Sequence, residues 1–388
     1  MQGNRWRWSL IWLGTVLLAA CGSSAPVGHG SNVAISTLAT TPTPIRTPIR
    51  LIQMADRQQG WGVTAFSGPS QQFLHTTTGG RTWADVTPRG YTTNPGEVIL
   101  DVRSATEAWA TSNATAQGTG QSLLWHSTDS GATWHTFTIA TSPIVQIDFI
   151  DTHHGWIVST PACCNAGPTP FDLWHTANGG VTWKLIGQGA FGLGVIATTF
   201  ATTTLGVQVT AFPGPPDGGF PIALRTQDGG HTWSPISLPT PNLGSSMTYS
   251  KAKAPVFTST QDGGMGAIYE TSTNTYLAVY LTHDGGATWR LSVVKEDQWC
   301  LDNLHTTAAR FIACSQGLST PVVLYHQVGS SWLSVPITPS SAVALEGMPV
   351  SGSGMLDMIS ATTGWAIATK GLFRTTDGGI QWSLLIAA

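Results

Sequence analysis

Thr226-Gln-Asp-Gly-Gly-His-Thr-Trp233 is the clearest copy of an octapeptide that recurs along the chain, and this octapeptide, called here the box segment, decides the fold. Its Asp or Asn side chain accepts hydrogen bonds from nearby backbone, and paired glycines adopt positive φ without a Cβ clash. The box segment is therefore typical of a tight turn between antiparallel strands. The copies occupy residues 76–83, 127–134, 176–183, 226–233, 282–289, 325–332 and 375–382.

The acidic or amide position and the final tryptophan are the structural residues of these turns. They are Asp129, Asn178, Asp228, Asp284 and Asp377, with Trp83, Trp134, Trp183, Trp233, Trp289, Trp332 and Trp382. Successive tryptophans lie about fifty residues apart, which indicates a radial or stacked repeat protein. Because the copy at 325–332 has lost its acid and one glycine, we interpret it as a decayed copy. Counting it gives seven repeats.

A second landmark lies upstream of most box segments, where a tryptophan stands between small or apolar residues after an alternating stretch. The copies are at 60–62, 108–110, 155–157 and 364–366. Alternation at period two before and after a short turn predicts a first and a second strand. With the two strands around the box segment, each repeat becomes a four-stranded antiparallel blade. We predict an all-β, seven-bladed β-propeller over residues 51–388, with six blades as the alternative.

The box segment with its upstream tryptophan resembles the Asp-box of the BNR-repeat β-propellers, most closely the group typified by the photosystem II stability and assembly factor. The same box occurs in sialidases and in xyloglucan-cleaving glycoside hydrolases. The resemblance covers residues 51–388 and implies the fold. It does not imply one function, because this fold carries both enzymes and binding proteins.

Composition narrows the function classes. Charged residues are 10% of the chain, the formal net charge is −3, and Gly numbers 44 and Trp 17. This is a strand-and-turn composition, and it lacks the basic footprint that nucleic-acid binding requires. We therefore expect no nucleic-acid partner.

The N-terminal segment predicts export. Arg5 and Arg7 precede an apolar run from Leu10 to Ala20, which is typical of a signal peptide over residues 1–20. Leu-Ala-Ala-Cys21 resembles a bacterial lipobox, which implies lipid attachment at Cys21. Residues 21–50 are rich in Ser, Thr and Pro and are predicted to be a flexible tether. We expect a lipid-anchored, monomeric protein on the outside of the bacterial cell membrane.

The arginines argue against a sialidase. In a four-stranded blade the box turns share one face with the turns between first and second strands, whereas sialidase chemistry occurs on the opposite face. The seven arginines placed by the repeats at the box-turn face or side are Arg57, Arg81, Arg103, Arg225, Arg290, Arg310 and Arg374. Only Arg89 remains in the propeller, and one arginine cannot form the triad that holds a substrate carboxylate.

Asp101, Asp148 and Asp357 recur at one place in the first strands of three blades, where they are expected to project toward the central channel. The favoured interpretation is a polar lining that hydrates the channel or caps backbone groups. The alternative is a catalytic carboxylate pair, which glycoside hydrolysis requires. For Trp125 and Trp174 we favour packing between blades over sugar stacking, and for His153 and His154 a surface turn. The histidine and cysteine spacings predict no metal site and no cofactor.

Four cysteines accompany Cys21 in an oxidising compartment. A local bridge between Cys300 and Cys314 is geometrically reasonable, which leaves Cys163 and Cys164 either as a strained vicinal pair or as free thiols. Cys163 and Cys164 belong to a long, proline-rich loop at 160–170, and 212–220 is a similar loop in the next repeat. These loops are expected on the face opposite the box turns.

Long loops on a rigid scaffold are common binding sites. We therefore expect a non-catalytic binding or assembly scaffold whose loop face contacts a protein or a glycan at the cell surface. The alternative function is an extracellular glycoside hydrolase of the Asp-box kind, either sialidase-like or xyloglucanase-like.

Overall fold

The computed structural model describes residues 33–36, 48–64, 71–88, 91, 98–112, 122–139, 143–159, 171–188, 195–210, 223–243, 247–252, 255–296, 299–303, 310–315, 322–346, 348 and 355–388. Several predicted features lie outside these residues. They are the signal peptide, Cys21, Arg89, and the two long loops with Cys163 and Cys164.

The described residues form seven sheets of antiparallel strands, which confirms the predicted seven-bladed all-β propeller. Blade 1 consists of β2 (Leu51–Met54), β3 (Gly60–Val63), β4 (Phe73–Thr76) and β5 (Ala84–Asp85). Blade 2 consists of β6 (Val98–Val102), β7 (Ala108–Ser112), β8 (Ser122–Ser127) and β9 (Thr133–Ile139). Blade 3 consists of β10 (Ile144–Phe149), β11 (Gly155–Ser159), β12 (Asp172–Thr176) and β13 (Lys184–Gln188). Blades 4 and 5 are β14 (Val195–Phe200), β15 (Gly206–Thr210), β16 (Ala223–Thr226) and β17 (Ser234–Ile236); and β18 (Thr248–Ala252), β19 (Val256–Phe257), β20 (Gly263–Glu270), β21 (Thr275–Thr282) and β22 (Arg290–Glu296). Blades 6 and 7 are β23 (Trp299–Asn303), β24 (Phe311–Ser315), β25 (Val323–Val328) and β26 (Ser331–Ser334); and β27 (Leu356–Met358), β28 (Gly364–Ala368), β29 (Gly371–Thr375) and β30 (Ser383–Ala387).

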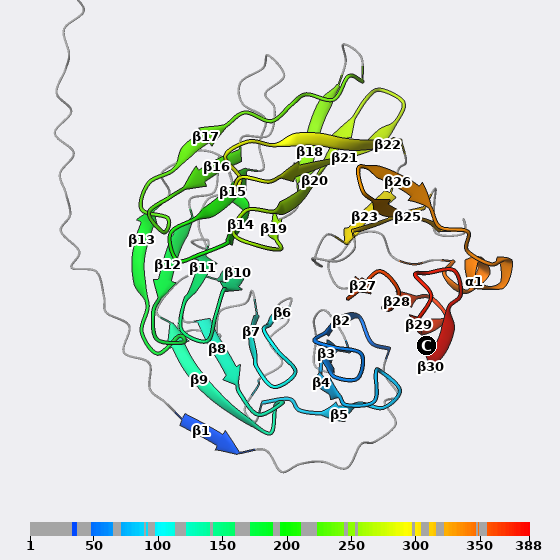
Figure 1. The fold of residues 1–388 in the computed structure, drawn as a ribbon. Coiled ribbons are helices and arrows are strands. Elements are labelled where there is room, and N and C mark those ends of the chain that lie inside the picture. Colours follow the sequence, from blue (N-terminus) through cyan, green and yellow to red (C-terminus); the bar gives the residue numbers. More distant parts are fainter. Residues whose placement is uncertain are drawn as a thin grey trace, which may run out of the picture.

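The blades follow one another around a ring, with first strands toward the centre and fourth strands outside (Figure 1). Among the described residues the four main strands of each blade follow one another in sequence order, so blade 7 meets blade 1 without sharing a strand. Blade 5 divides its inner edge between β18 and β19, both of which pair with β20.

The core lies mainly between neighbouring blades. The landmark tryptophans Trp61, Trp109, Trp156 and Trp365 are at most 1% exposed, so the second strands of these four blades are packed closely against their neighbours. One cluster joins Val63 and Phe73 of blade 1 to Val98 and Trp134 of blade 2. Because burial of apolar area is the main favourable term in folding, these clusters hold the ring together.

The box segment of blade 4 shows why the repeat turns. Gly229 and Gly230 have φ of 74° and 99°. The Asp228 carboxylate accepts hydrogen bonds from the Thr232 backbone N–H at 2.8 Å and the Thr232 hydroxyl at 2.6 Å. Trp233 Nε1 donates to Gly230 O at 3.0 Å, which folds the ring over the turn.

Other residues reproduce the same turn. In blade 3, Asn178 Oδ1 accepts from Thr182 N at 2.9 Å, and in blade 1 the Thr78 hydroxyl accepts from Thr82 N at 2.8 Å. A single side-chain oxygen at this position is therefore common to the turns, whether it belongs to Asp, Asn or Thr.

Blade 6 differs from the prediction of a decayed box. Val328 pairs with Ser331, so β25 and β26 are joined by a two-residue hairpin instead of an octapeptide turn. Trp332 Nε1 donates to Ser292 Oγ of blade 5 at 3.1 Å and does not cap its own turn. The lost acid and glycine leave a shorter connection, and the blade survives because its strands still pair.

Two elements were absent from the predicted blade pattern. The strand β1 (Val33–Ser36), inside the predicted tether, pairs antiparallel with the outer edge of β9. The helix α1 (Pro339–Ala344) lies between blades 6 and 7, where Pro339 opens it. No helix among the described residues is long and apolar enough to cross a membrane.

Candidate functional site

The inner-strand aspartates connect neighbouring blades. Asp101 Oδ2 of blade 2 accepts a hydrogen bond from Phe149 N of blade 3 at 2.7 Å. Asp148 Oδ2 of blade 3 accepts from Phe200 N of blade 4 at 2.6 Å. This arrangement matches the backbone-capping interpretation of these carboxyl groups.

Asp357 makes the same contact where the ring closes. Its Oδ2 accepts from Met54 N of blade 1 at 2.6 Å, across the contact between the last blade and the first. A contact between two neighbouring blades is called here a seam and is numbered by its blades, so this one is seam 7–1. Capping by Asp357 is one of the bonds that replace a shared strand at this seam.

The three carboxyl groups are desolvated, and burial is the largest influence on each. Burial raises the pKa of Asp101 to about 6, although the positive charge of Arg103 lowers it. For Asp148, burial and then the nearby Asp101 charge raise the pKa to about 7. Burial alone raises the pKa of Asp357 to about 7. Raised carboxyl pKa values also occur in catalytic acids, so the electrostatics alone do not decide between the two roles.

Seam 3–4 has an additional polar contact on the inner strands. Gln146 Oε1 accepts from Thr198 N at 2.7 Å, and the Gln146 amide donates back to Thr198 O. The equivalent of the inner aspartate in blade 1 is Gln53, whose Oε1 is buried without a hydrogen bond among the described residues. The inner seams therefore differ in how well their polar groups are satisfied.

On the box-turn face, a landmark tryptophan usually reaches the box of the next blade. Its indole N–H donates to the carbonyl of the first box glycine there. The pairs are Trp109 with Gly179 at 3.5 Å, Trp156 with Gly229 at 3.1 Å and Trp365 with Gly79 at 3.0 Å.

Blade 4 has Val207 where blades 1, 2, 3 and 7 have this tryptophan, as the register with β16 shows. Arg225, opposite Val207 on β16, supplies the missing donor: its Nε donates to Gly285 O of blade 5 at 3.0 Å. The guanidinium thus replaces the indole as the link across seam 4–5.

The residue before the box threonine or serine is basic or imidazole in five blades, a pattern that the sequence analysis missed. These residues are His75, His126, His175, Arg225 and Arg374. His126 stacks on Trp109 at 4.0 Å and bonds Glu107 at 3.0 Å, while Arg374 lies 5.0 Å from the Trp365 ring. Burial lowers the pKa of His126 to about 4, so it is neutral near pH 7. This recurrence, one position before the box, was the signal that could have found them.

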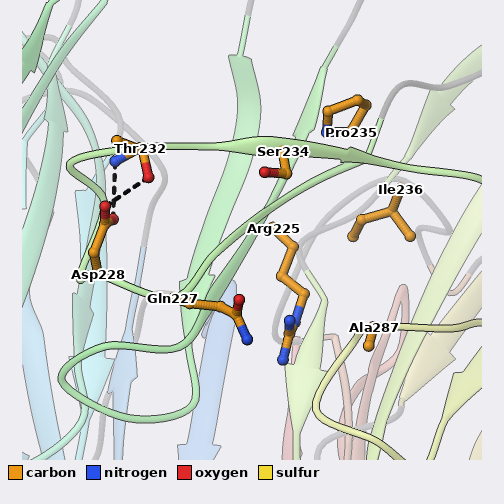
Figure 2. Close-up of a pocket in the computed structure, with 8 residues that line it drawn as sticks. All are labelled: Arg225, Gln227, Asp228, Thr232, Ser234, Pro235, Ile236 and Ala287. Carbon is orange, nitrogen blue, oxygen red and sulfur yellow. Dashed lines mark hydrogen bonds between the residues drawn. The ribbon is translucent and has the colours of Figure 1, made fainter.

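A cavity of about 280 Å³ opens at seam 4–5 (Figure 2). It is lined by Arg225, Gln227, Asp228, Thr232, Ser234, Pro235, Ile236 and Ala287. All but Ala287 belong to β16, β17 and their box turn, and Ala287 comes from the box of blade 5. The cavity therefore lies beside box turns, on the side of the ring that the sequence analysis assigned to scaffold.

Several other predicted residues can be placed. Trp125 and Trp174 are buried in the clusters between blades, as the packing interpretation expected. His153 is exposed, and His154 bonds Asp151 at 2.9 Å within a turn. Among the described residues, no three or more His, Cys, Asp or Glu side chains are placed to hold a metal ion.

The cysteine prediction concerns β23 and β24. Cys300 is directly opposite Cys314 in their antiparallel register. Residues so paired have Cα atoms about 4.5–5.5 Å apart, within the range that a disulfide spans. The Cys300–Cys314 bridge stays a prediction, which this register favours.

Comparison with known proteins shows the fold. No family model matches the chain, and no curated protein matches it. Its structure is similar to YCF48 bound to D1 peptide, with a TM-score of 0.53 and 14% identity over 89% of this chain and 97% of that one. YCF48 from Cyanidioschyzon merolae gives 0.52 and 14% over 88% and 97%. An oligogalacturonate lyase in complex with manganese gives 0.56 and 7% over 91% and 98%. At such identities the similarity extends to the fold alone.

Proposed function

We propose that this protein is a non-catalytic binding scaffold that holds a protein partner on its propeller. The observation that carries the proposal is the use of the inner aspartates. Asp101, Asp148 and Asp357 are the carboxylates that the sequence offers for catalysis, and each caps a backbone N–H of the next blade. Because a carboxylate that stabilises a seam already has a structural role, the fold accounts for them without a reaction.

Two further observations support a protein partner. The box-turn face carries an open cavity at seam 4–5. Concave sites of this kind commonly bind small molecules or a side chain of a partner protein. YCF48, a propeller of similar fold, has been seen with a peptide of D1 bound to it. We place the partner of this protein on the box-turn face, beside Gln227.

We further propose that the propeller is exported and anchored by lipid at Cys21, outside the cell membrane. The lipobox-like Leu-Ala-Ala-Cys21 after an apolar run supports this. Cells that express the full chain should incorporate labelled fatty acid into it, and the Cys21→Ala variant should not. Equal labelling of both would refute the anchor.

A photo-crosslinking experiment on intact cells tests the partner. A photoreactive residue replaces either Gln227, on the box-turn face, or Lys370, in the short turn between β28 and β29 on the opposite face. We expect a discrete crosslinked protein from position 227 and none from position 370. Crosslinks from both positions, or from position 370 alone, would contradict the placement.

A glycoside hydrolase is the second candidate, because both Asp101 and Asp148 have raised pKa values and the charge of Asp101 helps to raise the pKa of Asp148. A screen of fluorogenic glycosides with the unlipidated Cys21→Ala protein tests it. Turnover that is lost in Asp148→Asn, in a variant that circular dichroism shows to be folded, would replace the scaffold proposal.

A further inference from the structure

Seam 4–5 lacks the landmark tryptophan that spans three of the other seams on the box-turn face. At seams 2–3, 3–4 and 7–1 an indole lies against the next box. At seam 4–5 the smaller Val207 stands in its place, and Arg225 reaches across to Gly285. The cavity of about 280 Å³ lies at this seam.

Arg225 has hydrogen-bonding capacity left over. Its Nε is used by Gly285 O, which fixes the guanidinium plane. Among the described residues, no hydrogen bond or ion pair within 4.0 Å involves its two terminal Nη groups, and the side chain is only half-buried. A guanidinium presents its donors as a fork that suits the two oxygens of a carboxylate.

The nearest acid does not neutralise this arginine. Asp228 also lines the cavity, but its carboxylate points to its own turn, where it accepts from Thr232 N and Thr232 Oγ1 (Figure 2). It also accepts from Thr226 Oγ1. These bonds, against an opposing effect of burial, lower the pKa of Asp228 to about 2. Asp228 thus stays ionised but occupied, and the charge of Arg225 remains available to a ligand.

The remaining walls define what accompanies the carboxylate. Pro235, Ile236 and Ala287 provide an apolar side, and Gln227 and Ser234 provide polar groups at the opening. An extended, highly charged ligand would leave the apolar wall uncovered. A carboxylate with a short apolar group beside it would use both sides.

Seam 7–1 shows that an arginine at this position does not suffice. Arg374 occupies the position equivalent to Arg225, but Trp365 is present there and lies beneath the guanidinium at 5.0 Å. Its Nη2 donates to Arg57 O at 3.2 Å, so one terminal nitrogen of this arginine is already bonded to the neighbouring blade. Of these two seams, the one with Val207 and Arg225 together leaves both the space and the donors.

We propose that the cavity at seam 4–5 is a binding site for a carboxylate that carries a short apolar group, held by the terminal nitrogens of Arg225. The chain terminus of a peptide and a free small carboxylic acid share this chemistry. The inference deepens the proposed function, because a peptide carboxylate here would belong to the partner. Binding of a small acid does not require that partner.

The test uses N-acetyl-L-alanine as the probe and its neutral isostere N-acetyl-L-alaninamide as the control ligand. Saturation-transfer NMR and calorimetry are performed on the unlipidated Cys21→Ala protein. We expect saturable binding of the acid with a Kd of about 1 mM and at least about tenfold weaker binding of the amide. Equal affinities, or no saturable binding of the acid at about 20 mM, would overturn the proposal.

Variants locate the site. Arg225→Gln should abolish binding, and Gln227→Glu should do so without removing the bond to Gly285, because the added carboxylate occupies the guanidinium. Arg290→Gln removes an arginine near the box of blade 5, outside the cavity, and should bind the probe like the parent. Retained binding in Gln227→Glu, or loss in Arg290→Gln, would refute the site.

A peptide arm separates the two sources of carboxylate. The tripeptide N-acetyl-Gly-Gly-Ala is compared with its C-terminal amide under the same conditions. Tighter binding of the free-acid peptide than of N-acetyl-L-alanine assigns the site to peptide termini, and equal binding assigns it to small acids. Binding of the probe without any crosslink at position 227 would keep the site and refute the partner.

Discussion

The aspartates of the inner strands and those of the box turns are the same residue type in opposite situations. Asp148 and Asp357 reach across a seam and have pKa values raised to about 7, with burial as the main cause. Asp228 and Asp284 stay within their own turns, where hydrogen bonds outweigh burial and lower their pKa values to about 2. The propeller thus uses carboxyl groups both between blades and within them. A rise in pH is expected to lower the stability that depends on the first group and to raise the stability that depends on the second.

The largest expected effect comes from the removal of a box tryptophan. Trp183 is buried and caps its turn through Gly180 O, so Trp183→Ala should lower the free energy of unfolding by about 3–5 kcal/mol. Trp332 of blade 6 is half-buried and has no box to cap, so Trp332→Ala should cost less than about 2 kcal/mol. Urea denaturation followed by circular dichroism measures both. Equal losses would show that the box adds nothing to the turn.

The inner aspartates should make stability fall as pH rises. A carboxyl with a raised folded pKa is protonated in the folded state while the unfolded chain releases its proton, so stability is lost between about pH 4 and pH 7. Asp148→Asn keeps an oxygen for Phe200 N and removes this loss. At pH 8 we expect the variant to be more stable than the parent by on the order of 2 kcal/mol, less than the full shift implies because the residue is partly exposed. Thermal midpoints measured from pH 4 to pH 8 decide this, and a parallel shift at every pH would be the contrary result.

The box aspartates should behave in the opposite way at acid pH. With a folded pKa of about 2, Asp228 contributes stability above pH 4 that is lost as pH falls toward 2. Asp228→Ala should cost about 1 kcal/mol at pH 7, since the site is exposed, and should flatten this acid limb. Asp228→Asn, which copies the natural Asn178, should keep most of the neutral-pH stability but lose the pH dependence. If Asn costs as much as Ala, hydrogen bonding to the turn is not the reason for the residue.

The smallest effect restores a box aspartate. Blade 1 has Thr78 where five other blades have Asp or Asn, and Arg81 lies nearby on the same turn. Thr78→Asp should raise stability by about 0.5 kcal/mol, with a matching new loss below pH 4. A lower thermal midpoint at pH 7 would indicate that the threonine hydroxyl already satisfies the turn.

The sequence predicted the blades well because their cause is local. The turn residues and the period-two alternation lie within each repeat, so seven blades over residues 51–388 follow from reading one repeat at a time. Counting the copy at 325–332 gave the seventh blade, but the sequence did not show that its turn is a two-residue hairpin between Val328 and Ser331. The sequence placed the three inner aspartates on first strands, but their partners Phe149, Phe200 and Met54 are set by how the blades meet.

The cavity at seam 4–5 could not be predicted for the same reason. It is lined by residues of blade 4, such as Arg225 and Ile236, and by Ala287 of the following blade, so no single repeat contains the whole lining. A comparison of the repeats nevertheless shows where this seam differs from the others. In blade 4, Val207 stands at the landmark tryptophan position and Arg225 precedes the box. Such a paired change in the sequence indicates a seam with different contacts between its blades.

Blade 7 meets blade 1 without a shared strand among the described residues. The pairing of strands within the blades therefore does not depend on which blade comes first in the chain. A propeller closed by a shared strand would lose a blade if it were cut elsewhere, but here every blade has its four main strands in sequence order. Circular permutation at any linker between blades would leave the pairings within the blades intact, and it would turn seam 7–1 into an ordinary covalent junction. Duplication or deletion of one repeat would likewise respect every blade, so blade number in such a ring can change through single genetic events.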